Sequence, residues 1–121
     1  MGGYGALLLG ARFAEKFSAI SAHSAITKLE QMEQFVEEPI AAYTTDLPNV
    51  IDAMKINQYQ LPPIRFDCGR KDTLLEPNRL LHQQLLDLNI EHSYQEFKGG
   101  HEWAYWQVHV EKTLRFFDKA I

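Results

Sequence analysis

The sequence of 121 residues contains little that would indicate disulfides, nucleic-acid binding or membrane insertion. Its single cysteine, Cys68, excludes an internal disulfide framework and fits a reducing compartment. Lysine and arginine number 12 against 16 aspartates and glutamates and do not cluster, which argues against nucleic acid or an anionic membrane as partner. The longest apolar run, at 6–9, is far shorter than the roughly 20 residues that span a bilayer, and it lacks the basic lead of a signal peptide. We therefore expect a cytoplasmic protein without a membrane segment.

What the sequence does contain is the material for one globular domain. Apolar residues make up 45% of the chain and aromatic residues 12%, enough to fill a core. The charged fraction of 23% is ordinary and excludes a disordered composition.

Glycine and proline divide the chain into alternating helices and strands. Helices are predicted after a glycine-rich turn at 2–5, over 26–36, from Asp46 and Pro48 onward, over 77–88 and over 103–117. Strands are predicted at 17–21, 64–68 and 92–97, and Asn89 is predicted to end a helix in the left-handed conformation. This alternation predicts an α/β fold with parallel strands and right-handed crossovers. Because a sheet of three parallel strands is poorly covered, the chain is interpreted as part of a larger fold.

The last predicted helix has an apolar stripe at helical spacing. The stripe consists of Trp103, Trp106, Val110, Leu114 and Phe117. Periodicity predicts that this stripe is mostly core, together with Tyr105.

Two polar loops follow the second and third strands, where functional groups gather in open α/β sheets. The first contains Asp72 and the second contains His101. An acid after one strand and a histidine after the next is the chain order of the later two members of the Ser-Asp-His triad in α/β-hydrolases. In such a pair, Asp72 would accept the imidazole Nδ1–H and stabilise the imidazolium, and His101 would move the proton.

Three segments carry a resemblance to one family. They are Met1-Gly2-Gly3-Tyr4-Gly5-Ala6-Leu7, Asp67-Cys68-Gly69-Arg70-Lys71-Asp72-Thr73-Leu74-Leu75 and Gly99-Gly100-His101-Glu102-Trp103-Ala104-Tyr105-Trp106. On these segments the chain resembles the carboxy-terminal half of the putative-esterase (esterase D-like) branch of α/β-hydrolases. The resemblance covers the whole chain, and its last segment is the most specific.

The resemblance implies a carboxylic ester or thioester hydrolase with Asp72 and His101 as triad acid and base. The nucleophilic serine is missing just before Met1, whose backbone N–H would form part of the oxyanion hole. Residues 1–121 would then be the C-terminal portion of the domain, as its last three parallel strands with flanking helices, and residues 24–61 a cap-like insertion. Trp103 would line the pocket for a small acyl ester substrate. No cofactor and no metal are implied, and the chain alone is expected to be inactive.

Three alternatives remain open. An acyltransferase of the same fold would share every residue named, and a serine peptidase of the prolyl-oligopeptidase kind would share the order of acid and histidine. A non-catalytic fragment would act by pairing with another chain, and a homo-oligomer is one form of such pairing.

Other candidate sites are weaker. His101-Glu102 opens like the zinc motif H-E-x-x-H, but Tyr105 stands where the second histidine belongs. Cys68 as a substitute nucleophile has only the basic Arg70-Lys71 pair nearby to lower its pKa, so a structural role is favoured. The remaining serines lack the elbow glycines: Ser18, Ser21, Ser24 and Ser93.

Overall fold

The computed structural model describes residues 1–35, 37 and 49–120, which form a three-stranded sheet with helices on both faces. The α-helices are α1 (Gly2–Arg12), α2 (Val50–Ile56), α3 (Leu75–Asp87) and α4 (Trp103–Ala120). The strands are β1 (Ile20–His23), β2 (Ile64–Gly69) and β3 (Ser93–Phe97). Short 3₁₀ helices are η1 (Ala14–Lys16), η2 (Leu29–Gln34) and η4 (Gln58–Gln60).

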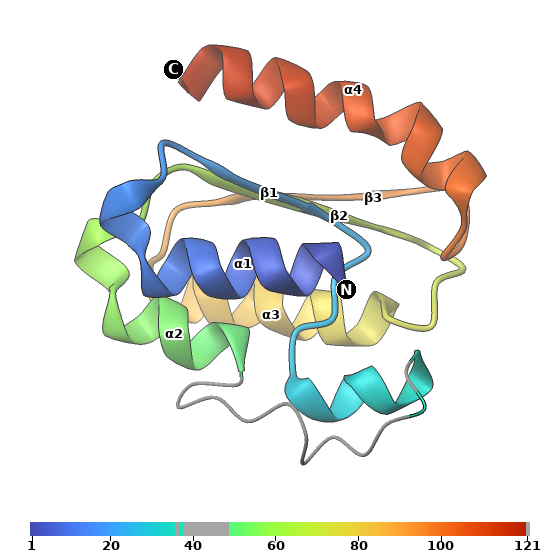
Figure 1. Cartoon of the computed structure of the whole chain (residues 1–121), viewed down its shortest axis with the longest axis horizontal. Coiled ribbons are helices and arrows are strands. Elements are labelled where there is room, and N and C mark those ends of the chain that lie inside the picture. The colour runs from blue at the N-terminus through green and yellow to red at the C-terminus, as the bar shows by residue number, and fades with distance from the viewer. Residues whose placement is uncertain (36, 38–48, 121) are drawn as a thin grey trace.

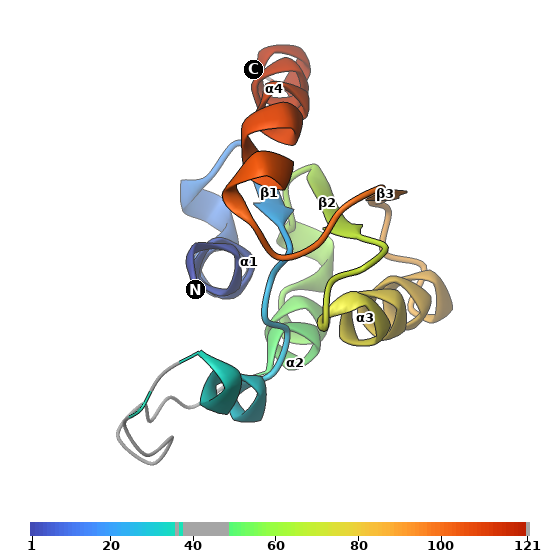
Figure 2. The same cartoon turned by 90° about the vertical axis from the view of Figure 1, so that its right-hand side faces the viewer.

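The sheet is parallel and its spatial order, β1-β2-β3, follows the chain. Ile20 pairs with Ile64, and Arg65 pairs with Ser93, so β2 is the central strand. Helices α1, α2 and α3 cover one face and α4 crosses the other, as the two views in Figures 1 and 2 show. The predicted α/β class with three parallel strands is confirmed.

The apolar core lies between the sheet and the layer of α1, α2 and α3. Alternate strand residues point into it, with Ile20, Ile64 and Phe66 almost completely buried. Leu7 of α1 and Leu81 of α3 fill the space beneath them. This single core holds together the scaffold from which the loops at the carboxyl ends of β2 and β3 project.

Several predicted boundaries shift in the structure. The strand predicted at 17–21 is found at Ile20–His23. The helix predicted over 26–36 is replaced by the shorter η2, and Val36, Asp46 and Pro48 lie outside the described residues. Asn89 has a φ of 56°, which confirms the predicted left-handed residue after α3.

The face of α4 that packs on the sheet differs from the predicted one. The buried residues of α4 are Tyr105 and His109, whereas Trp103 is 76% exposed and Leu114 63% exposed. The prediction that the apolar stripe is core is therefore wrong for Trp103, Val110 and Leu114. The sheet face beneath α4 carries polar side chains, and the helix turns Tyr105, His109 and Thr113 toward it. None of the described helices has the length and apolarity to cross a bilayer.

Candidate active site

Asp72 and His101 lie together at the carboxyl edge of the sheet. Asp72 belongs to the turn that follows β2, and His101 belongs to the connection between β3 and α4. Because β2 and β3 are parallel neighbours, their loops leave the sheet at the same edge.

The two side chains are joined by a hydrogen bond. His101 Nδ1 lies 3.0 Å from Asp72 Oδ2, and the other carboxylate oxygen, Oδ1, accepts the N–H of Leu74 at 2.9 Å. The Asp72 carboxylate is fully buried, whereas the His101 side chain is 27% exposed. An imidazole that donates from Nδ1 to a buried carboxylate has Nε2 left as a proton acceptor, which is the state that a general base needs.

Backbone contacts hold the two loops against each other. The N–H of Lys71 donates to the carbonyl of Gly99 at 2.9 Å, and the N–H of Arg70 donates to the carbonyl of Phe97 at 2.8 Å. A Cβ on Gly69 would stand 2.2 Å from the Gly99 carbonyl oxygen, so only glycine permits this approach. Gly99 itself has a φ of 126°, which side chains rarely adopt.

Two aromatic rings flank the His101 imidazole. The Phe35 ring centroid is 4.9 Å from that of His101, and the Trp106 ring meets the imidazole edge-on at 5.0 Å. Both rings restrict the orientation of the imidazole. Trp106 stands in the family-like segment around His101, whereas no motif marks Phe35 as a neighbour of His101.

A cavity of about 440 Å³ opens beside His101. Met1, Gly2, Trp103 and Trp106 are among its lining residues, so Met1 and Trp103 share a cavity with His101. Met1 stands immediately before the first turn of α1, where free backbone N–H groups favour an anion.

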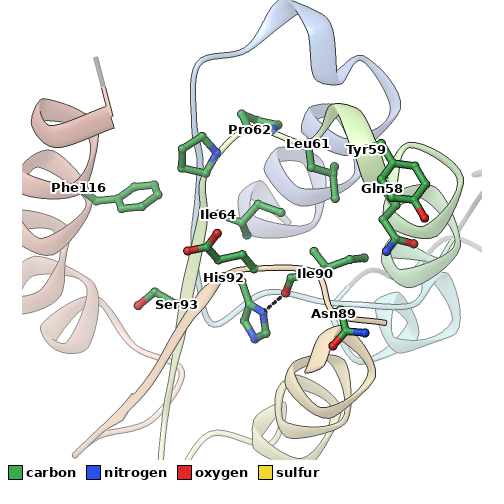
Figure 3. A pocket seen from close by; sticks show the side chains of 12 residues that line it. Gln58, Tyr59, Leu61, Pro62, Ile64, Asn89, Ile90, His92, Ser93 and Phe116 are labelled. Atoms are coloured by element: carbon green, nitrogen blue, oxygen red, sulfur yellow. Dashed lines mark hydrogen bonds between the residues drawn. The ribbon is translucent and has the colours of Figure 1, made fainter. Parts of the chain in front are cut away.

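A cavity larger than the one beside His101 lies elsewhere and is shown in Figure 3. It has a volume of about 530 Å³ and lies at the amino ends of β2 and β3, where Ile64 and His92 contribute to its wall together with Phe116 of α4. Asp72 and His101 are not among its lining residues. The hydrogen-bonded acid and histidine, and not this larger cavity, therefore define the candidate active site.

Beneath α4 lies a buried polar cluster that sequence reasoning missed; we call it the Asp67 cluster. Its members are Ser21, His23, Arg65, Asp67, Tyr105 and Thr113. The Asp67 carboxylate pairs with Arg65, lies 2.7 Å from His23 Nδ1 and accepts the Tyr105 hydroxyl at 2.6 Å. Burial by itself raises the pKa of Asp67, but the groups around it outweigh burial and hold the pKa below its usual value. The only signal in the sequence was the alternation of polar and apolar residues in β2.

Cys68 is fully buried at the end of β2. Burial, and then the negative charge of Asp72, raise the pKa of its thiol to about 12. Such a thiol is protonated at neutral pH, in keeping with the structural role favoured from the sequence.

Comparison with known proteins places this arrangement in a class and then in a family. An S-formylglutathione hydrolase from Staphylococcus aureus superposes with a TM-score of 0.85 at 19% identity, covering 96% of this chain and 50% of that one. A ferulic acid esterase superposes with a TM-score of 0.81 at 24% identity, and the superposition covers 100% of this chain and 48% of that one. Three parallel strands with flanking helices that superpose on these enzymes define a partial α/β-hydrolase fold.

Sequence comparison supplies the family. The family described as Putative esterase matches residues 1–117. An acetyl esterase from Caldicellulosiruptor saccharolyticus is 26% identical over 139 residues, which cover 99% of this chain and 52% of that protein. The chain belongs to the Putative esterase family, and it spans about half the length of the relatives that it matches.

Proposed function

We propose that this chain supplies the acid and the base of a Ser-Asp-His triad that hydrolyses carboxylic esters or thioesters. The observation that carries the proposal is the hydrogen bond of 3.0 Å between His101 Nδ1 and the buried carboxylate of Asp72. Membership of an esterase family supports ester hydrolysis as the reaction.

The proposed reaction proceeds through an acyl-enzyme. A serine hydroxyl attacks the ester carbonyl carbon while its proton passes to Nε2 of His101, and Asp72 stabilises the imidazolium. His101 then gives this proton to the leaving alcohol or thiol. In the second half, His101 takes a proton from water, the hydroxide attacks the acyl carbon, and the serine leaves with the proton restored.

The nucleophile of this scheme is proposed to be a serine that stands just before Met1 in the sequence. The backbone N–H of Met1 would then donate to the oxyanion, because Met1 stands at the start of α1 beside the cavity that His101 lines. The 121-residue chain would be inactive by itself, and its half length relative to the acetyl esterase supports this division.

Residues 24–61 are proposed to act as a cap that limits the size of the substrate, through the part around η2, since α2 within this range belongs to the helical layer that covers the sheet. The contact of Phe35 with the His101 ring supports this role, as does the hydrogen bond between Thr73 and Gln34 at 3.3 Å. Trp103, exposed beside the same cavity, would line the binding site for a small acyl ester.

One alternative is favoured by a specific observation. A capsule O-acetyltransferase of Neisseria meningitidis superposes with a TM-score of 0.72 at 21% identity, covering 94% of this chain and 52% of that one. The same acid and histidine would serve acyl transfer to an acceptor hydroxyl if water were kept from the acyl-enzyme.

Fluorophosphonate labelling of the natural source tests the proposal, because these probes modify activated serines. Labelled bands are identified by peptides from 99–115, and product analysis with an added alcohol separates hydrolysis from acyl transfer. We expect these peptides in a labelled band of about twice 14.0 kDa. Peptides found only in a band that never labels would contradict the proposed function.

A further inference from the structure

The Asp67 cluster joins the two structural elements that carry Asp72 and His101. Asp67 lies in β2, the strand that leads into the Asp72 turn, and Tyr105 lies in the first turn of α4, directly after His101. Both side chains are buried, with exposed fractions of 0% and 3%. Their hydrogen bond of 2.6 Å therefore connects the acid loop with the histidine loop inside the protein.

Tyr105 also touches the turn that holds His101. A Cβ on Gly99 would stand 3.0 Å from Cδ2 of the Tyr105 ring, so the ring packs directly on the Gly99 backbone. The carbonyl of Gly99 accepts the N–H of Lys71 from the acid loop. The Tyr105 ring thus packs on the loop that carries His101, while the Tyr105 hydroxyl binds Asp67 of β2, the strand that leads into the Asp72 turn.

The Asp67 carboxylate has partners on both oxygens. Arg65 and His23 pair with Oδ2, whereas the Tyr105 hydroxyl binds the other oxygen, Oδ1. Arg65 and His23 compensate the buried charge at one oxygen, and the Tyr105 hydroxyl stabilises the carboxylate at the other. The same Tyr105 bond sets the position of α4, and with it His101, relative to β2.

We propose that Tyr105 is a positioning residue that holds His101 in hydrogen-bonding register with Asp72 through its bond to Asp67. This inference rests on the proposed function, in which the Asp72–His101 pair is the acid and base. It adds a residue that never touches the substrate and yet controls which nitrogen of His101 is free to accept a proton.

The test measures the tautomer of His101 in the 121-residue chain by long-range ¹H–¹⁵N correlation NMR, at a pH where the imidazole is neutral. Bound to Asp72, the ring carries its proton on Nδ1. We expect Tyr105→Phe to lower the share of the Nδ1–H tautomer at least twofold. Asp72→Asn provides the reference for a disrupted pair.

Tyr94→Phe is the matched control. The Tyr94 hydroxyl also donates to a carboxylate, that of Glu96, at 2.8 Å, but it lies on β3 and takes no part in the Asp67 cluster. This variant is expected to keep the wild-type tautomer of His101, and melting temperatures of all variants report stability separately.

Each outcome decides between the two proposals. A Tyr105→Phe chain that melts at a lower temperature but keeps the wild-type tautomer would overturn the positioning role alone, as would one that fails to fold, since the contact would then be structural. A wild-type chain without a preference for Nδ1–H would instead contradict the acid–base pair of the proposed function.

Discussion

At the residue scale, each carboxylate oxygen of Asp72 has its own partner. Oδ1 accepts the N–H of Leu74 and shapes the turn, while Oδ2 binds His101. A buried acid that is held in this way costs no reorganisation when the imidazole becomes charged. The division also allows the two roles to be separated experimentally.

Asp72→Asn is expected to preserve the turn and abolish efficient proton transfer. The amide can keep its oxygen on Leu74 N–H but then offers His101 a donor, which selects the wrong tautomer. In the proposed esterase, kcat should fall on the order of 10⁴-fold. Steady-state kinetics with p-nitrophenyl acetate measures the loss, and unchanged kcat would exclude Asp72 as the triad acid.

Cys68 is expected to be unreactive in the folded chain. With a pKa of about 12, its thiolate fraction at pH 8 is about one part in ten thousand, and the side chain is fully buried. Treatment with a chromogenic disulfide at pH 8 should release negligible thiolate until denaturant is added, when one thiol per chain reacts. Rapid reaction of the folded chain would show that the end of β2 opens.

At the scale of elements, the geometry of the candidate active site depends on how closely the end of β2 approaches the turn after β3. Gly69 and Gly99 make this approach possible, since the Gly99 carbonyl lies where a side chain at Gly69 would be. The loops with Asp72 and His101 meet only because these two backbones touch.

Gly69→Ala is expected to destabilise the chain by about 1–3 kcal/mol, because the new Cβ would push the backbone of Gly99 away from that of residue 69. Gly5→Ala is the matched control, since nothing lies within 4 Å of its Cβ and it stands inside α1. There alanine should stabilise by about 0.5–1 kcal/mol. Urea unfolding measures the free energy of unfolding of both variants. An unchanged free energy for Gly69→Ala would mean that the two loops can separate without loss of stability.

Helix α4 shows where periodicity from sequence is insufficient. The stripe from Trp103 to Phe117 is real in the sequence, but the sheet beneath α4 exposes Ser21, His23 and Arg65 to it. Thr113 forms hydrogen bonds with those three groups and Tyr105 with Asp67 beside them, whereas leucine offers no partner. The helix therefore turns the side with Tyr105 and Thr113 inward.

At the scale of the whole molecule, the exposed apolar residues of α4 and the outer edge of β1 form one surface that no other part of the described chain covers. On α4 this surface includes Trp103, Val110 and Leu114. Among the described residues, β1 is hydrogen-bonded to β2 alone, so its other edge presents unpaired backbone groups. A cavity lined by Phe17, Ile20 and Phe117 continues this surface toward α1. Exposed apolar area beside an open strand edge favours association.

The isolated chain is expected to self-associate through this surface. Its weight-average mass in sedimentation equilibrium should rise above 14.0 kDa with concentration, and Leu114→Glu should lower that rise. Leu86→Glu is the control, because Leu86 is 49% exposed but lies on α3, on the opposite layer. A constant mass of one chain at all concentrations would contradict the prediction and, with it, the pairing of this fragment with a second copy of itself.

The sequence by itself determined the α/β class, the three strands, the left-handed Asn89 and the loops that contain Asp72 and His101. These features depend on local patterns and on residues near one another along the chain. Tertiary structure alone decided the contact of Phe35 with His101, the inward face of α4 and the Asp67 cluster. Asp67 is hydrogen-bonded to Tyr105, which lies 38 residues further along the chain, and a local pattern carries no information about which face that helix will present.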